Sequence, residues 1–426
     1  MRAFFSVVAL QLKAAARSKA IALLFVASLA WMFAVPGLVS GDGTADGAHQ
    51  VFVRYSLWGV FVLVLVSLAA AGAGSLSSDR DARRLQLTLV RPARRFAVAL
   101  GRMVALVAVG ASVLAVCALV ALCRSDASRR CWHVLSPVME SPRSEAERAY
   151  RRYMESPETP DELKKTDKRV LVRILERKAF DRYETVRPGA SASWRFDTAR
   201  IGADDDIAAR LRFSSEMGTR EDFTGTFALG ARTGSVSNIT QTVVTVPLAA
   251  ADAAVAYAED GLVFTNSGRD SLMLRPRRDV QIVHSSSDCT FARNLAFALV
   301  VMVSMLSAVV AFSVFLGAGL GRSPAVFTVM VTLFLAAASP AVMEDYQDEV
   351  NSGKGDRVGL ALAQFAGVMT RPLGSFSPIG SLADDECVEL RDVARAVSVD
   401  FVLLPLFFAF LAAFIMPVKQ ESAIAG

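Results

Sequence analysis

The sequence predicts an α-helical integral membrane protein with six transmembrane helices and an inserted extracytoplasmic α+β domain that contains a β-sandwich. The chain has 426 residues, of which 53% are hydrophobic, and its mean hydropathy is +0.40. Soluble chains are about 45–50% apolar, with charges spread along their length. Here the apolar residues form charge-free blocks near both ends, and the middle carries most of the charge.

Six segments are long and apolar enough to cross a bilayer, which takes about 20 residues. They are 20–38, 56–76, 103–122, 295–320, 324–343 and 401–418. None has a charged residue in its apolar body, which argues against a proton-driven pump or a charge-lined channel. Residues 2–18 are amphipathic, which favours an interfacial helix over an extension of the first span.

Basic residues predict the orientation of these spans, because cytoplasmic loops are enriched in Lys and Arg. The N-terminal tail, an arginine-rich stretch at 79–102, Arg322 and Lys419 fall on one side, and the acidic loop 344–400 falls on the other. We therefore expect a multi-pass protein of the bacterial cytoplasmic (inner) membrane with both termini in the cytoplasm. The net charge of +5 serves this orientation, and no nucleic-acid partner is expected.

The predicted organisation has three parts. They are an N-terminal membrane half at 1–123, an extracytoplasmic domain at 124–293, and a C-terminal membrane half at 294–426 with the outer loop 344–400. Within the insertion, charged residues with helical spacing occupy 140–187, and apolar residues alternate over 190–290. Short strands between turns predict an antiparallel sandwich of jelly-roll or immunoglobulin-like kind. Trp194 shares a face with Phe196 and is expected in its core rather than as a sugar-binding platform.

Five cysteines are present. Cys131 and Cys289 bracket the insertion, where its two ends must approach each other, and an oxidising compartment would allow a disulfide between them. Two unbonded thiols remain an alternative, as does pairing with Cys387. Cys117 and Cys123 are expected to be inert.

Patterns that carry chemistry are missing from the sequence. The His and Cys residues do not have the spacing of a zinc site, and neither a phosphate-binding GxxxxGK[ST] nor a GxSxG nucleophile motif occurs. The chain is therefore not expected to be an enzyme, nor to hold a metal or cofactor of its own.

The arginine-rich stretch forms the expected cytoplasmic loop 77–102 between the second and third spans. It contains an acid–Arg–acid triplet, a leucine-rich run, an Arg-Pro-x-Arg-Arg sequence and a Gly-Arg pair. The residues concerned are Asp79, Arg80, Asp81, Arg83, Arg84, Leu85, Leu87, Arg91, Pro92, Arg94, Arg95, Gly101 and Arg102.

This loop, the interfacial helix and the number of spans together resemble the permease subunits of ABC-2-type transporters. In that family the loop carries acid-Arg-acid, Gly-Thr, a leucine-rich run, Arg-Pro-x-x-Arg and Gly-Lys. The present chain departs from the pattern at Arg83 and Arg84, where Gly-Thr would stand. The resemblance covers the membrane parts. It implies a cytoplasmic ABC ATPase that binds ATP and Mg, a second permease copy or homologue, and membrane lipid as partners.

Two functions follow from these observations. The first is a permease driven by a separate ATPase, which exports an amphipathic or lipid-like substrate or transmits force to the outer domain. Its loop would dock in a groove of the ATPase, although the arginines could also serve orientation alone. The alternative is a non-transport sensor or scaffold whose outer sandwich binds a ligand or an envelope protein.

Overall fold

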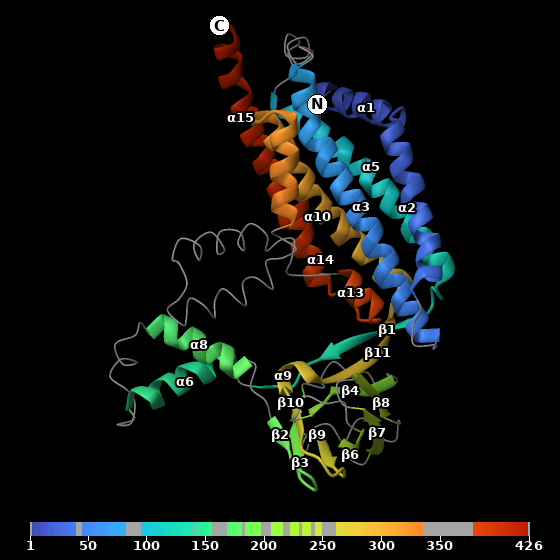
Figure 1. Ribbon diagram of the computed structural model, residues 1–426, viewed down its shortest axis with the longest axis vertical. Helices are drawn as coiled ribbons and strands as arrows, with labels where there is room; N and C mark the ends of the chain where they lie inside the picture. The colour runs from blue at the N-terminus through green and yellow to red at the C-terminus, as the bar shows by residue number, and fades with distance from the viewer. Residues whose placement is uncertain are drawn as a thin grey trace. The chain divides into compact units, whose positions relative to one another are not determined.

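The computed structural model divides the chain into two compact units (Figure 1). The described residues are 2–39, 45–81, 95–139, 141–155, 168–180, 184–196, 206–215, 222–229, 232–239, 243–248, 261–334 and 378–424. Met1–Arg129 and Thr290–Gly426 form one unit, which we call the helical unit. Arg130–Cys289 form the other, which we call the inserted unit.

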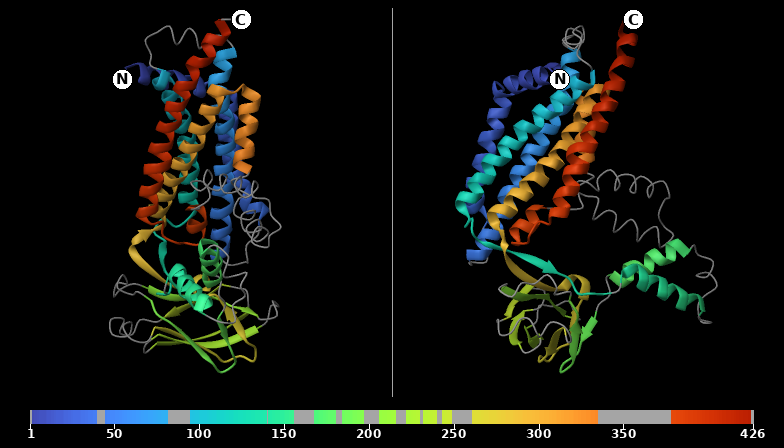
Figure 2. Two further views of the ribbon diagram at one scale, coloured as in Figure 1. Left: turned by 90° about the vertical axis from the view of Figure 1, so that its left-hand side faces the viewer. Right: turned by 180° about the vertical axis from the view of Figure 1, so that it is seen from behind.

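The helical unit consists of long apolar helices and a few short ones. They are α1 (Arg2–Ala16), α2 (Lys19–Leu38), α3 (Ala45–Asp81), α5 (Arg95–Arg124), α10 (Phe291–Gly319), Arg322–Phe334, α13 (Pro378–Ala383), α14 (Leu390–Ala396), the π-helix η1 (Val397–Leu403) and α15 (Leu404–Ile424). Both views of Figure 2 show the long helices running side by side as a bundle.

Five helices in the described part of the chain are long and apolar enough to cross a membrane. These helices are Lys19–Leu38, Gly47–Ser77, Arg95–Arg124, Phe291–Gly319 and Leu390–Ile415. The chain thus has the helices of a multi-pass membrane protein. The sixth predicted span, 324–343, begins within the shorter apolar helix Arg322–Phe334, and its remainder lies outside the described residues.

The last of these helices corrects the predicted start of the final span. It begins at Leu390 rather than near 401, so that the end of the expected outer loop 344–400 is helical; residues 335–377 lie outside the described residues. It also contains Asp400, a buried residue directly before the predicted apolar body 401–418. The apolar run begins at 401, but the helix includes the mixed residues before it, because backbone hydrogen bonding continues through α14 and η1.

Small residues allow the central helices to pack closely. α10 packs against α3, α5 and α15, and α3 also packs against α2 and α5. A Cβ atom on Gly317 of α10 would overlap with the carbonyl oxygen of Ala73 in α3. Close backbone approach at such positions is a general feature of helix packing in membranes.

The inserted unit combines short strands with two packed helices. The helices are α6 (Pro142–Glu155) and α8 (Lys168–Phe180), which pack against each other, and the short α9 (Pro276–Asp279). The strands are β1 (Arg130–Leu135), β2 (Glu184–Val186), β3 (Ser191–Trp194), β4 (Asp206–Arg212), β5 (Ser214–Ser215), β6 (Asp222–Leu229), β7 (Arg232–Ile239), β8 (Val243–Leu248), β9 (Leu262–Asn266), β10 (Leu272–Leu274) and β11 (Val280–Thr290).

The strands form three sheets around one apolar core. Their orders are β1-β11-β4-β8, β2-β10-β5 and β3-β9-β6-β7. Phe213, Phe227 and Phe264 lie at the centre of the core, and Trp194 also belongs to it, as predicted. The indole N–H of Trp194 donates to Glu184 Oε2 at 3.1 Å, which satisfies the polar atom of this buried side chain.

Candidate functional site

The ends of the predicted coupling loop are helical. Asp79, Arg80 and Asp81 form the end of α3, and α5 begins at Arg95. Gly101 and Arg102, expected at the end of the loop, lie inside α5 and are buried. The structure therefore brings together the two helices that flank the loop. The other predicted residues of this set lie outside the described residues, and they are Arg83, Arg84, Leu85, Leu87, Arg91, Pro92 and Arg94.

A buried arginine ties the two flanking helices together. Arg102 is 3% exposed, and its guanidinium donates to the carbonyl oxygen of Ser75 in α3. A charge is costly to bury unless it is hydrogen-bonded. The bond to Ser75 satisfies one donor of the Arg102 guanidinium and so allows α3 and α5 to pack around it. The bond lies within two turns of the end of α3 and of the start of α5.

The amphipathic α1 packs against the same turn of α5. A Cβ atom on Gly101 would lie 3.0 Å from Val7 Cγ1, which means that α1 approaches the backbone of α5 here. α1, α3 and α5 are thus joined where the arginine-rich loop begins and ends. We call this end of the helical unit the arginine end.

A cavity of about 330 Å³ lies between the helices at the arginine end. Residues from α1, α2, α3 and α5 contribute to its lining, and five of the twelve lining residues are alanines. Arg322, at the start of the helix that follows α10, contributes the single charge in the lining. From the sequence, Arg322 was expected only to orient the neighbouring spans, because no sequence pattern relates it to α3.

The opposite end of the helical unit, called here the insertion end, contains a buried ionic cluster. Asp385 is 4% exposed, and its Oδ2 accepts from Arg129 at 2.7 Å and 3.1 Å. His49 Nε2 lies 3.7 Å from Asp385 Oδ1, and His49 Nδ1 lies 3.4 Å from the hydroxyl of Ser125. Because these residues come from three distant parts of the chain, the cluster holds the ends of α3 and α5 to the segment after α13.

Further hydrogen bonds complete this end. The amide of Asn294 in α10 donates to the carbonyl of Glu386 at 2.7 Å, and its oxygen accepts from Val388 N–H at 2.7 Å. Asp126 accepts from the hydroxyl and the backbone N–H of Ser128, and these bonds lower the pKa of its carboxyl. Hydrogen bonds and ion pairs thus hold the chain segments at the insertion end together. These contacts were not predicted, because the residues that make them do not share a sequence motif.

The predicted disulfide between Cys131 and Cys289 was wrong. Cys131 is present as a buried thiol, whereas Cys289 and Cys387 are the disulfide-bonded cysteines, in line with the alternative that involves Cys387. The two ends of the insertion do approach each other, since Phe291 N–H donates to the carbonyl of Arg129 at 2.8 Å. However, a disulfide also requires suitable side-chain directions, and proximity of the chain ends does not provide them.

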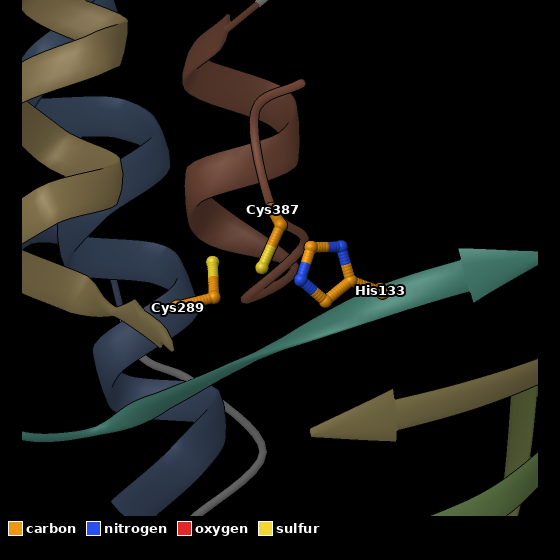
Figure 3. A group of neighbouring side chains, drawn as sticks. All are labelled: His133, Cys289 and Cys387. Carbon is orange, nitrogen blue, oxygen red and sulfur yellow. The ribbon is translucent and has the colours of Figure 1, made fainter. Parts of the chain in front are cut away.

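Figure 3 shows the side chains of His133, Cys289 and Cys387. In the inserted unit, a ring nitrogen of His133 and Cys289 Sγ lie within 4.8 Å of each other. Metal ions are held by thiolates rather than by disulfide sulfur. Since Cys289 is in a disulfide, we assign no metal site to this pair.

Cysteine alkylation tests this assignment. In denaturant without reductant, iodoacetamide should modify Cys117, Cys123 and Cys131 but leave Cys289 and Cys387 unmodified. After reduction, all five cysteines should be modified. Peptide mass spectrometry measures both states, and modification of Cys289 before reduction would contradict the assignment.

Comparison of the chain with protein-family models, with curated proteins and with solved structures found no match.

Proposed function

We propose that this chain is the membrane permease subunit of an ABC-2-type transporter, driven by a separate cytoplasmic ATPase that binds ATP and Mg. It exports an amphipathic or lipid-like substrate or transmits force to the inserted unit. The observation that carries the proposal is the arginine end. There the helices flanking an arginine-rich loop are tied by Arg102 and braced by α1.

The tie gives the loop a mechanical role. A displacement of the loop by the ATPase reaches α3 and α5 together, because Arg102 connects them within two turns of the loop. Rigid elements that move as one body are a common means of transmitting such a displacement. Since α3 and α5 also pack against α10, the movement continues into the centre of the bundle.

Charge and disulfide chemistry support one orientation. Arginines concentrate at the loop between α3 and α5, which supports a cytoplasmic location for the arginine end. Disulfides persist in oxidising compartments, and Cys289 adjoins the start of α10 at the insertion end. The inserted unit is then outside, and both termini are cytoplasmic. A second permease copy or lipid covers the exposed apolar face of α15, which includes Phe407, Phe410 and Phe414.

Removing the basic and rigid residues of the loop should separate the chain from its ATPase. We expect the combined change Arg91→Ala, Pro92→Ala and Arg95→Ala to reduce co-purification of an ATPase from mild detergent at least tenfold. The reason is that the substitutions remove positive charges proposed to contact the ATPase and a proline ring, which restricts φ. Quantitative mass spectrometry of the tagged full-length chain, with an ATPase assay of the same sample, measures the effect.

The matched control is the combined change Lys13→Ala and Arg17→Ala, which removes basic charge from α1 and the residue after it. Membrane insertion should be normal for both variants, and the control should retain the ATPase. Equal retention in the loop variant, or a clean preparation without any ATPase, would contradict the proposal. The second outcome would favour the sensor or scaffold.

A further inference from the structure

The cavity at the arginine end has an apolar wall. Ala70 and Ala71 of α3 and Ala105 of α5 contribute methyl groups to it, and no Asp or Glu is part of the lining. Its volume of about 330 Å³ is at the lower end of the range for small-molecule sites, about 300–1,000 Å³. Ala71 is exposed, so the cavity opens at the side of α3. This wall suits a hydrocarbon chain that enters from the surrounding bilayer.

One side of the cavity is positively charged. The Nε of Arg322 would lie 3.3 Å from a Cβ atom on Gly74, which means that the guanidinium lies over α3 where this helix has no side chain. No ion pair joins Arg322 to another described residue. A guanidinium presents a planar set of donors that matches the oxygens of a phosphate.

The start of α2 adds to this positive side. Ser18, the N-cap residue of α2, lines the cavity, and its side chain makes no capping hydrogen bond. The first amides of a helix have no partner within the helix, and they carry a partial positive charge that favours anions. Gln11 of α1 supplies a further polar side chain to the lining.

We propose that this cavity binds an anionic phospholipid. The phosphate group lies between Arg322 and the start of α2, and an acyl chain lies along the alanines of α3 and α5. The combination of a cationic side, an apolar wall and a lining without carboxylates selects this ligand over a neutral or a fully soluble one. The inference rests on the membrane location in the proposed function but not on the ATPase.

The position of the cavity gives the lipid a consequence. Ser75 lines the cavity and also accepts the hydrogen bond from Arg102 that ties α3 to α5. A bound lipid therefore contacts the same turn of α3 that a movement of the loop displaces. We therefore assign an anionic amphiphile as the chemical class of a substrate or regulator that acts at this site.

Photo-crosslinking tests the inference on the full-length chain in liposomes. The probe is a phosphatidylglycerol with a diazirine in its acyl chain, and mass spectrometry maps the labelled peptides. We expect labelling of the α3 and α5 segments that contain Ala71 and Ala105, and about a tenfold loss with Arg322→Ala, as for one charge-assisted contact. Arg322→Lys should retain part of the labelling, because it keeps the charge.

Three comparisons make the result decisive. Arg391→Ala removes an exposed cation of α14 that does not line the cavity and should leave labelling unchanged. A phosphatidylcholine probe should label weakly, and millimolar inorganic phosphate should not displace the phosphatidylglycerol probe. Unchanged labelling with Arg322→Ala, equal labelling by phosphatidylcholine, or displacement by inorganic phosphate would each overturn the inference. ATPase co-purification, measured on the same variants, reports on the proposed function separately.

Discussion

Replacing Asp385 with alanine is expected to lower the free energy of unfolding of the helical unit by about 3 kcal/mol, because removing one partner of a buried ion pair leaves the other charge uncompensated. The side chain of Asp385 is 6% exposed and that of Arg129 is 28% exposed, so solvent compensates little of the loss. His49 loses the same carboxylate. Thermal unfolding in mild detergent, followed by tryptophan fluorescence, measures the change.

Two further variants separate the charge from the backbone. Asp385 has a φ of 54°, a left-handed conformation that asparagine also tolerates. Asp385→Asn therefore retains the backbone and removes only the charge, and it should account for most of the loss. Asp384→Asn is the matched control, because the Arg54–Asp384 pair is 50% and 41% exposed and should contribute less than about 1 kcal/mol. Equal losses at both positions would contradict a special role for the buried cluster.

The second large effect is expected at Gly317. The carbonyl oxygen of Ala73 occupies the place that a Cβ atom would need, and backbone atoms can yield only if α3 and α10 move apart. Gly317→Leu should therefore cost about 3 kcal/mol or more, at the upper end of the range for overpacked cores. Size-exclusion chromatography and thermal unfolding of the detergent-solubilised protein measure the loss.

Gly319 provides the control on the same helix. A Cβ atom there would meet Ile415 at 3.7 Å, an ordinary van der Waals distance. Gly319→Ala should be neutral, whereas Gly317→Ala should already be destabilising. If the two alanine variants were equally stable, close approach of the helices would not explain the glycine at 317.

The sequence was a reliable guide to elements with a strong apolar pattern. Long uninterrupted apolar runs identified the helices of the bundle, and alternating apolar residues over 190–290 indicated the strands of the inserted unit. β7 lacks a strong apolar pattern, because its residues, RTGSVSNI, are mostly small and polar. β7 is an edge strand, with β6 as its partner in the sheet. Such a strand needs less apolar alternation than a strand inside a sheet.

The candidate site was less predictable. The loop between α3 and α5 follows from local sequence, and its arginines are visible without a structure. His49, Arg129 and Asp385 come together only through packing of segments far apart in the chain. The same holds for Arg322 and Gly74. Asp400 was expected outside the last span, because the apolar run begins at 401. The helix nevertheless begins earlier, at Leu390, and includes Asp400.

The hydrogen bond between Phe291 and Arg129 has a consequence for how such a chain could arise. It brings the end of the α5 segment to the start of α10, a gap that a short turn could close. The inserted unit has an apolar core of its own. A gene segment encoding 130–289 could therefore be gained, lost or exchanged without rebuilding the bundle. In evolutionary terms, the helical unit would be retained while the inserted unit varies.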